Sequence, residues 1–185
     1  QARGQSRETL IHVPMEPIGY PRVNPGENPI LVQMGQTEVE KLLNRHFSEL
    51  QYCLGINNHM GSLATTDAAV MGHVMKILRD KNKVFLDSRT SNVSIAYQTA
   101  QKHHIPAYRN DIFLDAPDIS QATMEKKLEQ IKNLSASRNY LIAITHCHSH
   151  EKLQYLRTFI SRLQSEGFTL IPLSQYGKYD VPPIS

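Results

Sequence analysis

The feature that most constrains the fold of this chain is a regular alternation of short apolar runs with longer amphipathic segments. The apolar runs cover residues 10–13, 53–56, 84–86, 112–114, 141–144 and 168–171. Apolar residues recur at helical spacing in segments 37–50, 67–79, 92–103, 124–134 and 153–163. Continuously apolar strands separated by helices are typical of parallel strands buried on both faces. The sequence therefore predicts an α/β fold, either a barrel or an open sheet.

Composition is that of a folded domain and argues against several other classes of protein. The chain has 185 residues, of which 40% are hydrophobic and 20% are charged, and these shares are ordinary for a single globular domain. No apolar run approaches the roughly 18 residues of a membrane span. The net charge of +3 comes without a basic block, which argues against a nucleic-acid-binding surface. Cys53 and Cys147 form neither a disulfide framework nor a CxxC zinc motif.

Ionisable and metal-ligating residues follow five of the predicted strands. In parallel α/β folds, ligands bind where the carboxyl ends of the strands meet. The residues at these ends are, in chain order, His12, Asn57-Asn58-His59, Asp87-Ser88-Arg89, Asp115 and Thr145-His146-Cys147-His148. Five such strand ends predict an active site at that edge.

Two pairs of histidines are candidate metal ligands. Imidazole suits zinc, and a catalytic zinc typically has three protein ligands and one open position for water. A lone histidine after a strand is more often structural, so the metal interpretation of His12 depends on His59. His146 and His148 alternate, and an extended segment would place both on one face. A metallohydrolase built on that second pair is the competing hypothesis, and a simple surface position for His148 is another.

Polar residues near the same strand ends are candidate substrate ligands or catalytic groups. The run 57–62 contains Asn57, Asn58 and Ser62, and turn geometry explains only part of it. Asp87 with Arg89 suggests a carboxylate held by a guanidinium. The alternative is that this segment only caps the next helix.

Five segments together resemble the divergent polysaccharide deacetylases, a bacterial branch of the polysaccharide deacetylase superfamily. They are His12-Val-Pro-Met-Glu-Pro17, Gly55-Ile-Asn-Asn-His-Met-Gly-Ser62, Phe85-Leu-Asp-Ser-Arg-Thr90, Asp111-Ile-Phe-Leu-Asp115 and Ile144-Thr-His-Cys-His148. The resemblance implies a distorted (β/α) barrel with fewer than eight, mostly parallel strands. It also implies a periplasmic or secreted protein whose partner is a polysaccharide or oligosaccharide substrate, with no nucleic acid and no membrane span in this chain.

The resemblance further implies a hydrolase of C–N (non-peptide) bonds that removes acetyl groups from an envelope polysaccharide with zinc or another divalent metal. His12 matches the first metal-histidine position. His59 is similar to the second imidazole ligand, because Glu16 replaces the histidine expected four residues after the first. His146 matches the histidine that protonates the departing amine, and Asp87 is the second catalytic candidate. Substrate binding is assigned to Asn57, Asn58, Ser62, Arg89 and Asp115.

Two departures from the family pattern leave a second function open. The family's apolar strand ending in Asp-Asp, which supplies a metal ligand and the base, has no match before His12. We therefore expect residues 1–185 to form a single catalytic domain that is N-terminally incomplete. The family's Arg-Asp pair becomes Asn110-Asp111. The alternative is a non-catalytic envelope protein of the same fold that binds glycan or a protein partner.

Overall fold

The computed structural model describes residues 7–178. The chain divides into two compact units, Gln1–Arg109 and Asn110–Ser185. Strands and helices alternate along the chain as in a distorted (β/α) barrel with fewer than eight strands, which is the fold class expected from the sequence. No helix of the described part combines the length and the apolar character needed to cross a membrane.

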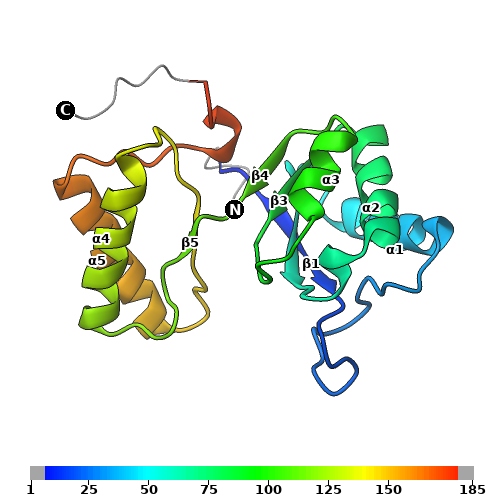
Figure 1. The fold of residues 1–185 in the computed structure, drawn as a ribbon, viewed down its shortest axis with the longest axis horizontal. Helices are drawn as coiled ribbons and strands as arrows, with labels where there is room; N and C mark the ends of the chain where they lie inside the picture. The colour runs from blue at the N-terminus through cyan, green and yellow to red at the C-terminus, as the bar shows by residue number, and fades with distance from the viewer. Residues whose placement is uncertain (1–6, 179–185) are drawn as a thin grey trace. The chain divides into compact units, whose positions relative to one another are not determined.

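The first unit is built on a four-stranded parallel sheet in the order β1-β2-β3-β4. Its strands are β1 (Leu10–Met15), β2 (Gly55–Met60), β3 (Val84–Asp87) and β4 (Ala107–Arg109). The connecting helices α1 (Gln36–Glu49), α2 (Ala68–Asp80) and α3 (Ala96–Lys102) lie on one side of this sheet (Figure 1). A short 3₁₀ helix, η2 (Ala64–Thr66), precedes α2. Because all neighbours are parallel, the carboxyl ends of the four strands share one edge.

Alternation along the strands buries one face of this sheet beneath the helices. Val13, Met15 and Phe85 are fully buried and pack with the apolar sides of the helices. Successive side chains of a strand point to opposite faces, so His12 projects from the face away from the helices. At the start of β2, a Cβ on Gly55 would lie 2.0 Å from the backbone oxygen of Val84, so only glycine fits there.

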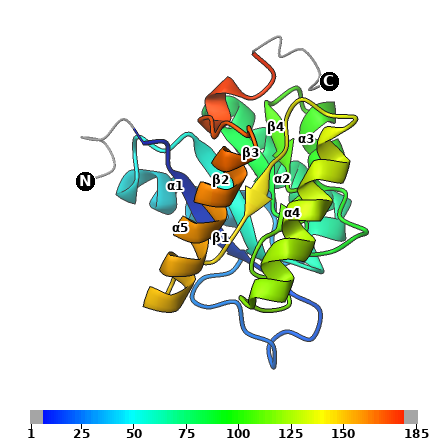
Figure 2. The same ribbon diagram turned by 90° about the vertical axis from the view of Figure 1, so that its left-hand side faces the viewer.

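The second unit contains a parallel pair of short strands and two helices. The strands are β5 (Ile112–Phe113) and β6 (Ala143–Ile144), and the helices are α4 (Gln121–Ser135) and α5 (His150–Ser165) (Figure 2). Its core joins Leu114 after β5 to Leu128 of α4 and Phe159 of α5. A 3₁₀ helix, η3 (Leu173–Gln175), follows α5.

The loop between β5 and α4 is fixed by a local hydrogen-bond network. Asp118 Oδ1 accepts hydrogen bonds from the backbone N–H of Ser120 at 2.9 Å and from the hydroxyls of Ser120 and Thr123, both at 2.6 Å. These bonds lower the pKa of Asp118 to about 2. The Ser120 hydroxyl in turn accepts from the Thr123 N–H and caps α4. This network holds the segment that directly follows Asp115.

Three local expectations from the sequence were wrong, and one strand was not expected. Residues 168–171 form no strand. Phe168 packs on the core of the second unit, and Leu170 is 52% exposed. Helix α3 begins at Ala96 rather than at residue 92, and Val93 is exposed. The strands were expected to be buried on both faces. All residues of β3 are buried, but His12 in β1 is exposed. Strand β4 was missed, since Ala107–Arg109 has no apolar run.

Candidate functional site

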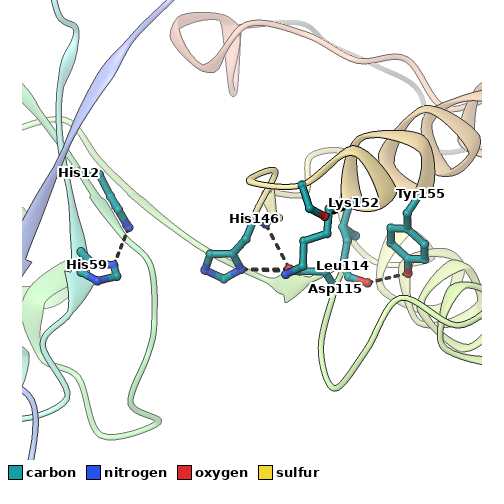
Figure 3. A network of polar contacts seen from close by, with 8 residues as sticks. His12, His59, Leu114, Asp115, His146, Lys152 and Tyr155 are labelled. Atoms are coloured by element: carbon teal, nitrogen blue, oxygen red, sulfur yellow. Dashed lines mark hydrogen bonds and ion pairs between the residues drawn. The ribbon is translucent and has the colours of Figure 1, made fainter. Parts of the chain in front are cut away.

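Strands β1 and β2 bring two of the predicted metal-ligating histidines together. In the parallel register, His12 lies opposite Asn57 and Pro14 lies opposite His59. The Nε2 atom of His12 is 2.9 Å from the Nδ1 atom of His59 (Figure 3). The rings meet edge to face, with centroids 4.7 Å apart. The two residues are far apart in sequence, and the register alone makes them diagonal neighbours on one face of the sheet.

The His12–His59 pair supplies two nitrogen donors of the type that zinc prefers. With Zn–N distances of 2.0–2.1 Å, two nitrogens of a tetrahedral site lie about 3.3 Å apart. The observed N···N distance of 2.9 Å needs only a small ring movement to reach that spacing. Within residues 7–178, no three His, Cys, Asp or Glu side chains gather as a metal-binding group. At this place the described residues therefore offer two nitrogen ligands and no third side-chain ligand.

Asn58, a predicted substrate ligand, joins the end of β2 to the segment after β3. Its side chain is fully buried, its Oδ1 accepts from the Ser88 N–H at 2.8 Å, and its Nδ2 donates to the Met60 carbonyl at 2.8 Å. The Thr90 hydroxyl donates to the same carbonyl at 2.6 Å. Met60 has a φ of 53°, a left-handed conformation that costs a non-glycine residue about 1–2 kcal/mol. Asn58 and Thr90 stabilise that conformation, and substrate binding by Asn58 stays a prediction.

We expect Asn58→Ala to lower the free energy of unfolding by about 2–3 kcal/mol, because the buried Ser88 N–H loses its acceptor. The neighbouring Asn57 offers a matched control. Asn57 is half-buried and its Nδ2 donates to the Ser88 hydroxyl at 3.0 Å, so Asn57→Ala should cost about 1 kcal/mol. Urea unfolding of both variants measures the difference. Equal losses would contradict a special structural role for Asn58.

Ser62 and Glu16 both hold the loop that follows β1. The Ser62 hydroxyl accepts a hydrogen bond from the backbone N–H of Ile18 at 2.9 Å. The Glu16 carboxylate is buried and accepts from the N–H of Val32 at 2.7 Å. Glu16 thus anchors backbone at the position where the family pattern has a histidine. The Ser62 hydroxyl thus accepts a backbone hydrogen bond in this loop. Its role in substrate binding stays a prediction.

Asp87 shapes the loop between β3 and α3. The residue is 1% exposed, and its carboxylate accepts from the backbone N–H of Arg89 and from the hydroxyl of Ser94, both at 2.8 Å. The sequence suggested a contact with the Arg89 guanidinium, whereas in the structure the carboxylate bonds to the backbone N–H of Arg89, a residue with a φ of 54°. The Arg89 side chain is exposed. Catalysis by Asp87 stays a prediction.

In the second unit, the pairing of β5 with β6 brings Asp115 to His146. Ile112 pairs with Ala143 and Phe113 with Ile144, and the same offset of 31 residues separates Asp115 from His146. The His146 Nδ1 atom lies 3.1 and 3.2 Å from the two carboxylate oxygens (Figure 3). The Phe113 ring stacks on the imidazole with an interplanar angle of 6°. A carboxylate at Nδ1 fixes the tautomer and directs Nε2 away from itself.

Lys152 completes this arrangement and was not anticipated from the sequence. Its Nζ atom lies 2.6 Å from Oδ2 of Asp115. Burial by itself would raise the pKa of Asp115, but the hydrogen bonds from Lys152 and His146 outweigh it and hold the pKa below its usual value. The Ser149 hydroxyl caps α5 by accepting from the Lys152 N–H at 3.2 Å. The sequence signal that could have revealed Lys152 is the helix cap at Ser149, because this cap places Lys152 in the first turn of α5.

Two other residues complete the surroundings of Asp115 and His146. The buried Tyr155 hydroxyl donates to the Leu114 carbonyl at 2.8 Å, and burial together with the charge of Asp115 raises the pKa of Tyr155. The His148 ring meets the His146 ring edge to face at a centroid distance of 6.5 Å. His148 and His150 are exposed. The His146/His148 metal hypothesis stays open as the competitor to the His12–His59 pair.

Comparison with known proteins defines the class to which this fold and these residues belong. Residues 1–176 match the divergent polysaccharide deacetylase family, and the chain belongs to this family. This confirms the resemblance seen in the five sequence segments.

Two relatives and one solved structure illustrate the similarity. An uncharacterized protein of Haemophilus influenzae is 31% identical over 146 residues, which is 79% of this chain and 51% of that protein. The uncharacterized protein YibQ of Escherichia coli K12 is 30% identical over 148 residues, or 80% of this chain and 46% of YibQ. The chain thus spans about half the length of these curated relatives. The crystal structure of uncharacterized protein ATU2773 from Agrobacterium tumefaciens C58 has a TM-score of 0.83 at 23% identity, covering 94% of this chain and 70% of that chain. This likeness shows the fold.

Proposed function

We propose that this chain is the catalytic part of a metal-dependent hydrolase that removes acetyl groups from a bacterial envelope polysaccharide, in the periplasm or outside the cell. The observation that carries the proposal is the Asp115–His146 pair, in which a buried carboxylate holds Nδ1 of a half-exposed imidazole. Family membership supports the choice of acetylated carbohydrate as the substrate class.

The pair suits the most demanding step in the hydrolysis of an acetylated amine. The amine is a poor leaving group, and it must receive a proton as the C–N bond breaks. His146 is the proposed general acid and presents its Nε2 atom, while Asp115 holds the ring at its Nδ1 atom. Protonation by a positioned side chain typically contributes about 10² to 10⁴ in rate.

The metal is assigned to the first unit. His12 and His59 would hold a divalent cation, with zinc as the first expectation, since their facing nitrogens are 2.9 Å apart. When bound, such a cation polarises an acyl oxygen and lowers the pKa of a coordinated water.

The substrate-binding residues divide into two groups by their contacts. Asn57 is half-buried and Arg89 is exposed, so we propose them for direct contact with sugar hydroxyl groups. The polar groups of Asn58, Ser62 and Asp115 already bond to other parts of the chain. For these three we propose that they hold the strand ends and His146 in place.

Acetate release tests the proposed function. The full chain is loaded with zinc and incubated with N-acetylated chitooligosaccharides or with peptidoglycan, and free acetate is measured enzymatically. We expect release that stops when a chelator is added and resumes when zinc is restored. Glycan binding without any acetate release would instead support the non-catalytic envelope protein of the same fold.

A further inference from the structure

The second unit places two cationic partners on one buried carboxylate. The Asp115 side chain is 2% exposed, the Lys152 side chain 23% and the His146 side chain 51%. Three nitrogen atoms lie within hydrogen-bonding distance of Asp115 Oδ2. They are Nζ of Lys152 at 2.6 Å, Nδ1 of His146 at 3.1 Å and the backbone nitrogen of His146 at 3.3 Å. The carboxylate is therefore shared between the imidazole and an ammonium group from another element, α5.

We propose that Lys152 is a positioning residue that balances the charge of Asp115 and thereby limits how tightly His146 holds its proton. The inference rests on the proposed role of His146 as general acid. In that role, Lys152 sets how readily His146 releases its proton to the leaving amine.

The physical basis is the net charge of the three side chains. An isolated carboxylate within 4–6 Å of an imidazole favours the charged imidazolium. With Lys152 on the same oxygen, Asp115 and Lys152 sum to zero, so a proton added to His146 meets a neutral pair rather than an unbalanced anion. General acids work best when they release their proton near the working pH. An overly stabilised imidazolium would be a poorer donor to the leaving amine.

The other groups around His146 do not supply this balance. Asp115 follows β5, Lys152 and Tyr155 come from α5, and His148 lies two residues beyond His146 on the segment after β6. The Tyr155 hydroxyl bonds to the Leu114 carbonyl, and the His148 ring meets the His146 ring at its edge. The uncharged Phe113 ring lies parallel to the imidazole, with the two ring centroids 6.1 Å apart. Lys152 is therefore the cation that contacts the carboxylate.

An NMR titration of the His146 ring in the full chain tests the proposal without requiring activity. The ring signal is assigned by its loss in His146→Ala. In Lys152→Met, we expect the midpoint of the titration to move to higher pH by about one pH unit. Lys152→Arg keeps the cation and should restore a midpoint close to that of the unaltered chain. Lys126→Met removes an exposed lysine of α4 and serves as the matched control, which should leave the midpoint in place.

Two outcomes would overturn the proposal: an unchanged midpoint in folded Lys152→Met, or a shift to lower pH. Lys152→Gln provides a second neutral variant if the methionine variant unfolds, and urea unfolding checks both. If the unaltered chain released no acetate, the proposed function would fail while the titration would still report the coupling. In an active protein, the pH profile of kcat should move in the same direction in Lys152→Met and return in Lys152→Arg.

Discussion

Replacing His146 by alanine is expected to lower kcat for hydrolysis of an N-acetyl sugar by about 10² to 10⁴, the usual contribution of a positioned general acid. Bound zinc should stay near the level of the unaltered chain, because the Nδ1 atom of His146 bonds to Asp115 and the proposed zinc ligands are His12 and His59. Initial rates of acetate release at saturating substrate, together with elemental analysis of the purified variant, measure both quantities.

An activated acetate ester provides the chemical control. A nitrophenolate leaves without a proton, so His146→Ala should slow ester hydrolysis much less than amide hydrolysis. His148→Ala is the matched variant, since its ring lies at the edge of His146 and it should lose little activity on either substrate. Equal losses on amide and ester, or loss of zinc from His146→Ala, would assign His146 a different role.

Removing either imidazole of the His12–His59 pair is expected to abolish stoichiometric zinc binding. Loss of an outer-shell partner alone typically weakens metal affinity by about 10–100-fold, and a direct ligand should count for more. His12→Ala and His59→Ala should therefore each lower zinc affinity by more than about 100-fold. Competition with a fluorescent zinc chelator gives the affinity.

Thermal unfolding supplies a second readout for the same pair. A ligand that binds only the folded state raises Tm as its concentration exceeds Kd, so zinc should stabilise the unaltered chain and His148→Ala, but not the His12→Ala/His59→Ala double variant. Full zinc occupancy in that double variant would reject the assignment. It would also promote the competing site at His146 and His148.

The sequence alone determined the fold class and the positions where chemistry-bearing residues occur. Alternating apolar and amphipathic segments follow from local periodicity, and β1, β2, β3 and the five helices formed near their predicted ranges. The same periodicity cannot show whether an apolar run finds a pairing partner. Residues 168–171 have the composition of a strand and form none, whereas β4 pairs with β3 despite its polar residues.

Tertiary structure decided which side chains meet. Asn57 and Asn58 are adjacent and chemically identical, yet strand alternation buries Asn58 as a backbone acceptor and leaves Asn57 on the face of His12. His12 and His59 become neighbours through the register of β1 and β2, and Asp115 and His146 through that of β5 and β6. Lys152 joins Asp115 because the Ser149 cap sets where α5 begins. Residue types and local periodicity can be read from the sequence. Strand register and the starts of helices follow from long-range packing and hydrogen bonding. Register and helix starts then determine which side chains each functional group contacts.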